Sequence, residues 1–217
     1  MFDVLVKVGG SLSNCSQLPA NLAIWSTLAG EYRLLLLPGG GPFADAVRLA
    51  DGRFNLSEST AHWMAILAMD QFAYLLADLL PDGSLVRDLV TARAVATAGR
   101  LAVLAPSALL FDLDPLPHSW QVTSDSIAAW LADYANIPRL VLLKSVAGVR
   151  RDNGQKPAAI WRQAPKSNLI DCDIVDKYFG QALSPTTKCW IIDGRRPERL
   201  GELLQHGETI GTEVVTG

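Results

Sequence analysis

Two lysines stand at the carboxyl ends of apolar runs, where a turn begins. Lys7 is followed by Gly9 and Gly10, and Lys144 is followed by a turn that contains Gly148. An ammonium group at a strand end can neutralise charge on a phosphoryl group, and the amides of a glycine turn can donate hydrogen bonds to phosphate oxygens. Because the lysine precedes the glycines, the first segment is not a Walker loop. A surface lysine before an ordinary turn explains Lys7 equally well, and it explains Lys144 better when that segment is taken alone.

A glycine triplet, Gly39, Gly40 and Gly41, separates a buried apolar run from an expected helix. Consecutive glycines cost backbone entropy, whereas a strand-to-helix crossover usually needs a single glycine. Amides at a helix N-terminus bind anions, so the triplet favours an anion site over a plain turn.

A third segment, Thr123-Ser124-Asp125, also leads into a helix. Thr123 or Ser124 is the expected helix cap. An acidic residue in the first helical turn often only complements the helix dipole, and this role is favoured for Asp125 when the segment is taken alone.

Short apolar runs alternate along the chain with helical stretches. This alternation predicts an α/β fold: a three-layer αβα sandwich with a mostly parallel, open central sheet. The expected strands cover residues 4–8, 33–37, 101–104, 140–143, 189–192 and, at an edge of the sheet, 212–215. The expected helices cover residues 18–29, 42–50, 57–80, 125–134, 174–183 and 198–204. We expect a single domain over residues 1–217, with an N-terminal lobe at about 1–138 and a C-terminal lobe at about 139–217.

The longest expected helix, residues 57–80, has two further features. Asn55 and Glu58 have the spacing of a capping box at its start. It is apolar on more than one face, which predicts a homodimer or a higher assembly. Residues 150–167 are polar and are expected to form a hairpin or a long loop.

The composition excludes several classes of protein. Hydrophobic residues make up 49% and charged residues 19% of the chain, which excludes disorder, and a net charge of −3 argues against a nucleic-acid partner. Cys15, Cys172 and Cys189 are far apart, which favours buried, reduced thiols over a disulfide framework or a zinc site. Asp70 and Asp78 interrupt the most apolar stretch, so no membrane partner is expected. With no visible targeting segment, the chain is predicted to be cytoplasmic.

Taken together, the order and spacing of these segments resemble the amino acid kinase superfamily. Residues 191–197 and 207–212 are similar to the closing elements of that family, so the resemblance covers essentially the whole chain. It implies an open αβα sandwich and phosphoryl transfer from ATP to a small-molecule phosphate acceptor, without a covalent intermediate. Mg²⁺ would be carried on the ATP phosphates rather than by a metal site of the protein. Such transfer depends on positioning and charge neutralisation.

The resemblance also implies roles for particular residues. Lys7 would contact the transferring phosphoryl group, and Asp125 would hold Lys7 and a second catalytic lysine. Lys177 is the best match for that lysine, although the glycine pair usual before it is missing; Ala147 likewise replaces an acid common before Gly-Val in relatives. The residues implied to bind ATP phosphates are Gly9, Gly10, Lys144 and Gly148. The residues implied to bind the acceptor are Gly39, Gly40, Gly41, Arg48, His62, Thr123 and Ser124.

The acceptor is indicated by residues 60–71 and 117–125. They resemble a short-chain subgroup of the family that includes the kinase of (5-(aminomethyl)furan-3-yl)methyl phosphate in methanofuran biosynthesis. The side chains that can form flat apolar walls for a furan are Trp63, Met64 and Trp120, and the carboxylates that can pair with an aminomethyl group are Asp45 and Asp70.

Several alternatives stay open. Helix packing explains His62 equally well, and an exposed helix position explains Arg48 slightly better than a phosphate contact does. A uridylate kinase and a kinase for a carboxylate such as an amino acid are alternatives within the same fold. A non-catalytic nucleotide-binding storage or regulatory protein is an alternative of another class.

Overall fold

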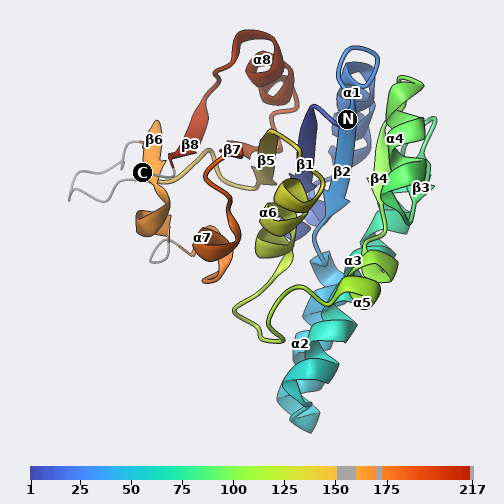
Figure 1. Ribbon diagram of the computed structural model, residues 1–217, viewed down its shortest axis with the longest axis vertical. Coiled ribbons are helices and arrows are strands. Elements are labelled where there is room, and N and C mark those ends of the chain that lie inside the picture. The colour runs from blue at the N-terminus through green and yellow to red at the C-terminus, as the bar shows by residue number, and fades with distance from the viewer. Residues whose placement is uncertain (151–159, 170–172, 216–217) are drawn as a thin grey trace.

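The computed structural model describes residues 1–150, 160–169 and 173–215. Within these ranges eight strands form one sheet in the order β3-β4-β2-β1-β5-β7-β8-β6 (Figure 1). Neighbouring strands are parallel, except that β7 and β8 are antiparallel. The strands are β1 (Val4–Val8), β2 (Leu34–Pro38), β3 (Ser84–Val86), β4 (Ala102–Leu104), β5 (Arg139–Lys144), β6 (Gln163–Pro165), β7 (Lys188–Asp193) and β8 (Gly211–Val215).

Helices cover both faces of the sheet. On one face α1 and α8 place Trp25 and Leu200 in the same core as Val6, and on the other face α6 places Ile127 in the same core as Leu5. The predicted α/β sandwich with a mostly parallel sheet is confirmed. The helices are α1 (Leu18–Leu28), α2 (Gly41–Phe54), α3 (Glu58–Asp78), α4 (Leu89–Thr97), α5 (Ser107–Leu113), α6 (Ser124–Tyr134), α7 (Phe179–Ala182) and α8 (Glu198–His206), with 3-10 turns η1 (Gly10–Asn14) and η2 (Lys166–Leu169).

Strand alternation decides which way the two lysines point. Along β1 the valines face the core that contains α1, whereas Leu5 faces the core that contains α6. Lys7 lies two residues after Leu5 and therefore shares its face, since successive side chains of a strand alternate. By the same alternation, Leu142 of β5 faces α6 and places Lys144 on that face as well. Both lysines thus point from the carboxyl ends of neighbouring strands toward α6.

The structure corrects some predicted element boundaries. The helix predicted over 42–50 continues to Phe54 and ends at Asn55, which has a left-handed φ of 50°. Asn55 therefore terminates α2 and does not cap α3; the cap is Ser57, whose Oγ accepts a hydrogen bond from the Thr60 amide at 3.2 Å. The helix predicted over 174–183 is limited to α7, so Lys177 precedes it.

Other corrections concern the sheet. The predicted edge strand 212–215 is β8, which lies inside the sheet between β7 and β6. The prediction omitted β3, α4 and α5, which are short and lack strong periodicity. The predicted lobe boundary immediately precedes β5, and this division of the chain stays a prediction.

The loop predicted over 150–167 lies partly outside the described residues. Its described part contains an antiparallel bridge between Arg150 and Ile160, and then β6. Cys189 is buried and free, Cys15 is free but partly exposed rather than buried, and Cys172 lies outside the described residues. No helix among the described residues has the length and apolarity needed to span a membrane.

Candidate active site

A cavity of about 390 Å³ opens at the carboxyl ends of β1 and β5. Its walls are η1, the N-terminal turns of α2, α3 and α6, and the segment that precedes α6. Most of the residues expected to bind substrates lie here, although the chain separates them widely. The expected residues that line the cavity are Lys7, Gly9, Gly10, Gly40, Gly41, Arg48, His62, Thr123, Ser124, Asp125 and Lys144.

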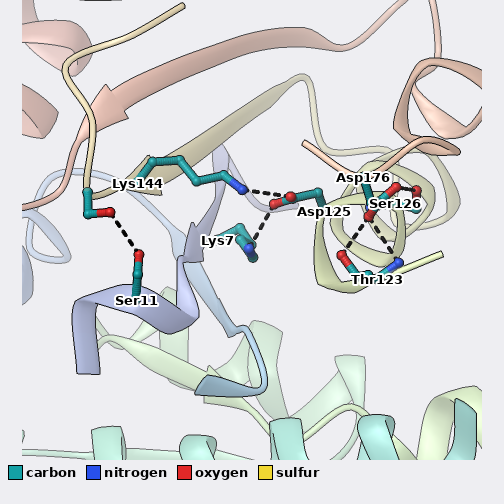
Figure 2. A network of polar contacts seen from close by, with 8 residues as sticks. Lys7, Ser11, Thr123, Asp125, Ser126, Lys144 and Asp176 are labelled. Carbon is teal, nitrogen blue, oxygen red and sulfur yellow. Dashed lines mark hydrogen bonds and ion pairs between the residues drawn. The ribbon is translucent and has the colours of Figure 1, made fainter. Parts of the chain in front are cut away.

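Two ammonium groups share one buried carboxylate at the base of this cavity. Lys7 Nζ donates a hydrogen bond to Asp125 Oδ1 at 2.7 Å, and Lys144 Nζ donates to Asp125 Oδ2 at 2.6 Å. Asp125 stands between the two lysines (Figure 2). The Lys7 side chain is 3% exposed and that of Lys144 is 14% exposed, so water screens these charges weakly. The cluster carries two positive charges for one negative charge and can attract an anion.

Burial and neighbouring charges set the protonation of the cluster. Burial tends to raise the pKa of Asp125, but the charges and hydrogen bonds of Lys144 and Lys7 together outweigh it and lower that pKa to about 2. For Lys7, burial outweighs the attraction of Asp125 and lowers the pKa to about 8, and the charge of Lys144 acts in the same direction. Near neutral pH the carboxylate is therefore ionised, and Lys7 is a cation that can lose its proton slightly above neutrality.

Asp176, which the sequence reasoning did not select, organises the turn that carries Asp125. Its Oδ2 accepts hydrogen bonds from the Thr123 amide at 3.0 Å, the Thr123 hydroxyl at 2.8 Å and the Ser126 amide at 3.0 Å, and its Oδ1 accepts from the Ser126 hydroxyl. Figure 2 shows the carboxylate between these two residues. Its partners are 50 or more positions away in the chain, so no local spacing marks it.

The glycine turns bring backbone close to the lysines. The Gly9 amide donates to the Leu143 carbonyl at 2.8 Å, which joins the turn after β1 to β5. A β-carbon on Gly9 would lie 2.6 Å from that carbonyl oxygen, and one on Gly40 would lie 2.4 Å from the β-carbon of Ala44. Both positions therefore require glycine for close approach rather than for a positive φ.

The far wall of the cavity carries charged and aromatic side chains. Arg48 pairs with Asp45 at 2.9 Å and lies over the Trp120 ring, 4.9 Å from its centroid. His62 is 7% exposed and stacks on His118 with 4.4 Å between ring centroids. Burial, with a smaller contribution from His118, lowers the pKa of His62 to about 4, so the imidazole is neutral at pH 7. His62 thus meets the cavity as a neutral hydrogen-bonding group.

Three expected site residues do not line the cavity. Lys177 is exposed, and the second ammonium on Asp125 comes from Lys144 instead. Gly148 has a φ of 151° and packs beside the Thr212 hydroxyl. Gly39 lies beneath the cavity, where an added β-carbon would stand 3.0 Å from the Gly10 nitrogen and 3.1 Å from Ser124 Oγ.

Some residues expected around the acceptor also have other contacts. Trp63 stacks on Phe111 at 4.5 Å, and Met64 packs against the small core around Val47. Asp70 accepts hydrogen bonds from the Ser107 amide and hydroxyl. Among the candidates for the furan wall and the amine, Trp120 and Asp45 are those that line the cavity, and Glu58 is a lining carboxylate that the sequence reasoning did not select.

Residues 4–162 match the model of the amino acid kinase family. The chain is 28% identical over 216 residues to [5-(aminomethyl)furan-3-yl]methyl phosphate kinase from Methanocaldococcus jannaschii, with 97% of each chain covered.

Solved structures support the same fold. A uridylate kinase from Archaeoglobus fulgidus superposes with a TM-score of 0.75 at 20% identity, covering 99% of this chain and 100% of that one. An isopentenyl phosphate kinase from T. acidophilum superposes with a TM-score of 0.61 at 18% identity, covering 97% and 99%.

Proposed function

Because the chain belongs to the amino acid kinase family and is a phosphotransferase, we propose that it transfers the γ-phosphoryl group of ATP to a small phosphate monoester. The acceptor we propose is (5-(aminomethyl)furan-3-yl)methyl phosphate or a close analogue. The observation that carries the proposal is the pair of ammonium groups that share the buried carboxylate of Asp125 at the base of the cavity. The named phosphate kinase that is similar over 97% of this chain supports the choice of acceptor.

The proposed reaction is a single displacement at phosphorus. An oxygen of the acceptor phosphate forms a bond to the γ-phosphorus while the bond to the bridging oxygen of ADP breaks, so the products are ADP and the acceptor diphosphate. Lys7 lies where it can neutralise charge on the transferring group, and Asp125 keeps both ammonium groups in place. Removing one such preorganised interaction typically costs about 100-fold or more in kcat.

The cavity fits the triphosphate chain of ATP. It offers two lysine cations and the backbone of two glycine turns, which suit phosphate oxygens. Among the residues described, no three His, Cys, Asp or Glu side chains are grouped to hold a metal, and Asp125 uses both oxygens on lysines. The proposed Mg²⁺ would bind together with the nucleotide, where it would neutralise charge on the phosphoryl groups.

The acceptor end of the cavity fits a small aromatic cation. Trp120 provides a flat wall, and Arg48, stacked on it, can bind the acceptor phosphate. Asp45 and Glu58 are the lining carboxylates available to an aminomethyl group, although Asp45 also pairs with Arg48. Ser124 lines the cavity with a hydroxyl that can contact the acceptor, whereas Thr123 donates its hydroxyl proton to Asp176.

The alternative functions differ in which acceptor is phosphorylated and in whether the nucleotide is turned over. A uridylate kinase and a carboxylate kinase would turn over other acceptors, and a storage or regulatory protein would bind the nucleotide without turnover. The buried, charged cluster favours catalysis over storage, because titratable groups with perturbed pKa values that line a cavity are typical of active sites. The roles of single residues, a cytoplasmic location and the homodimer stay predictions.

The test is a comparison of kcat/KM across four acceptors: the furan phosphate, uridylate, isopentenyl phosphate and a free amino acid. The diphosphate is detected by ³¹P NMR and ADP by a coupled assay. Each polar pocket group left unpaired by a wrong acceptor costs about 1–3 kcal/mol, or about 5- to 150-fold, so the furan phosphate should lead clearly. Preference for uridylate would overturn the acceptor, and nucleotide binding without any turnover would favour the storage protein.

Two variants show whether turnover arises at the described cavity. Lys7→Ala should lose about 100-fold or more in kcat. Lys188→Ala is the matched control, because this exposed lysine lies at the opposite end of the sheet, where Lys188 pairs with Arg139 in the register of β5 and β7. Equal turnover in the two variants would place the reaction elsewhere.

A further inference from the structure

We propose that Asp176 is a positioning residue for phosphoryl transfer, whose carboxylate fixes the first turn of α6 and thereby holds Asp125 in contact with both lysines. The inference deepens the proposed function, and it rests on that function only for the reaction that the positioned groups serve.

The first turn of α6 depends on Asp176 for its hydrogen bonds. The N-cap residue Thr123 makes no side-chain capping bond to its own helix, and its hydroxyl donates to Asp176 instead. Asp176 also accepts the amides of Thr123 and Ser126, which lie in the part of a helix that has no intrahelical acceptor. A residue from a distant segment thus satisfies the donors that a local cap would normally satisfy.

The turn that Asp176 fixes is the one that carries the chemistry. Asp125 lies between the two residues bound by Asp176, and both oxygens of Asp125 are committed to Lys7 and Lys144. Ser126 is fully buried, so its hydroxyl has no water to replace Asp176. Rotation of this turn would move Asp125 away from at least one lysine, and a displacement of about 1 Å at a reacting group can cost on the order of 100-fold in rate.

The segment that brings Asp176 is itself docked on α6. The Tyr178 amide donates to the Gln121 carbonyl at 3.1 Å, and Phe179 of α7 is buried in the core that contains α6. Because Asp176 lies just before α7 and Gln121 just before α6, these contacts attach the C-terminal part of the chain to the turn at the active site. Asp176 is the side chain of this segment that accepts the hydrogen bonds of the turn.

Charge provides a second effect that a plain helix cap would lack. The groups that influence the charge of Lys7 are Asp125 on α6, Lys144 on β5 and Asp176 before α7. The negative charge of Asp176 favours the protonated form of Lys7 and raises its pKa. Loss of that charge therefore lowers the pKa of Lys7 and leaves fewer molecules with the cation needed for transfer.

The experiment uses three variants and a matched control in the full chain. Asp176→Ala removes all four hydrogen bonds, Asp176→Asn removes the charge while keeping one acceptor oxygen, and Ser126→Ala removes one donor while keeping the charge. Asp88→Asn is the control, because Asp88 caps α4 through the Thr91 amide at 2.7 Å and hydroxyl at 2.8 Å, away from the cavity. Thermal melting gives the folded fraction, to which every rate is normalised.

Positioning predicts a specific pattern of kinetic effects. Asp176→Ala should lower kcat by about 100-fold with little change in the KM for ATP, and Ser126→Ala should lower it less. Asp176→Asn should also move the alkaline limb of kcat/KM to lower pH, whereas Ser126→Ala and Asp88→Asn should not. If Asp176→Ala lowered only the melting temperature, with kcat per folded molecule unchanged, Asp176 would be an ordinary cap and the proposal would be overturned.

A measurement without turnover separates this inference from the proposed function. The Lys7 titration can be followed by NMR in protein labelled with ¹³C-lysine, assigned with Lys7→Arg. Its midpoint should fall in Asp176→Asn and stay in place in Asp88→Asn. Wild-type protein that turned over none of the acceptors would overturn the proposed function, while an unmoved Lys7 midpoint in Asp176→Asn would overturn the electrostatic link to Asp176.

Discussion

Gly10 and Gly41 lie in direct backbone contact, although one follows β1 and the other begins α2. A β-carbon on Gly10 would lie 2.6 Å from the Gly41 nitrogen and 2.8 Å from its α-carbon. Gly41 has a φ of 54°, a conformation that glycine adopts without strain. The two glycine turns thus form a single surface, in which Gly10 is required by the close approach of Gly41, and Gly41 by its own positive φ.

Gly10→Ala should damage this surface. The added methyl group must displace backbone, which typically costs about 1–3 kcal/mol of stability, and it should lower kcat/KM as the turns separate. The control is Gly52→Ala in α2, because a β-carbon there meets nothing within 4 Å. Thermal melting and steady-state kinetics on both variants measure these effects. Equal melting temperatures and equal kcat/KM in the two variants would contradict the close contact of Gly10 with Gly41.

Lys144→Ala should cost more activity than Lys177→Ala. Lys144 shares Asp125 with Lys7 and lines the cavity, whereas Lys177 is exposed and does not line it. We expect kcat to fall by about 100-fold for Lys144→Ala. A larger loss in Lys177→Ala would instead support the sequence-based assignment of Lys177 as the second catalytic lysine, through movement of the segment before α7.

Asp125→Asn should lower kcat more than it raises the KM for ATP. The carboxylate orients two lysines, and an amide can accept from only one of them through its oxygen. Asparagine caps helices about as well as aspartate, so a plain capping role predicts almost unchanged activity. Steady-state kinetics with a melting curve distinguishes the two outcomes.

The pH dependence of kcat/KM should reflect the protonation of Lys7. Its pKa is lowered to about 8, so kcat/KM, which reflects the free enzyme, should fall as pH rises above about 8 and the cation is lost. In the pH profile of kcat, the alkaline limb should lie at higher pH than in that of kcat/KM, because bound phosphates favour the protonated lysine. Lys7→Arg should abolish the limb, since the guanidinium stays charged, although its different shape should also slow the reaction. A limb that persists in Lys7→Arg would assign it to another group.

The chain should assemble through α3. Leu67 is 44% exposed and Tyr74 is 52% exposed on this helix, so it presents apolar surface that the sheet does not cover. Sedimentation should find a homodimer or a larger species at micromolar concentration, and Leu67→Glu should weaken the association between the copies. A single species of 23.4 kDa would contradict the prediction.

The sequence by itself predicted the fold class and most of the expected residues that the structure brings to the candidate cavity. Apolar runs separated by helical stretches are a local signal, and the lysine at the end of β1, the glycine triplet and the segment before α6 follow from residue type and position. The helix boundaries were predicted less accurately. Asn55 has the spacing of a cap for α3, but its left-handed backbone ends α2 instead.

Only the tertiary structure decided which charged groups meet. Local sequence left both Lys144 and Lys177 as candidates for site residues, and the parallel pairing of β5 with β1 brings Lys144 to Asp125. Asp176 carries no signal in its own neighbourhood, because its hydrogen bonds go to residues 50 and 53 positions away. Contacts between distant segments depend on how the sheet orders its strands and how the helices pack on it, and that order is a property of the folded chain rather than of any one segment.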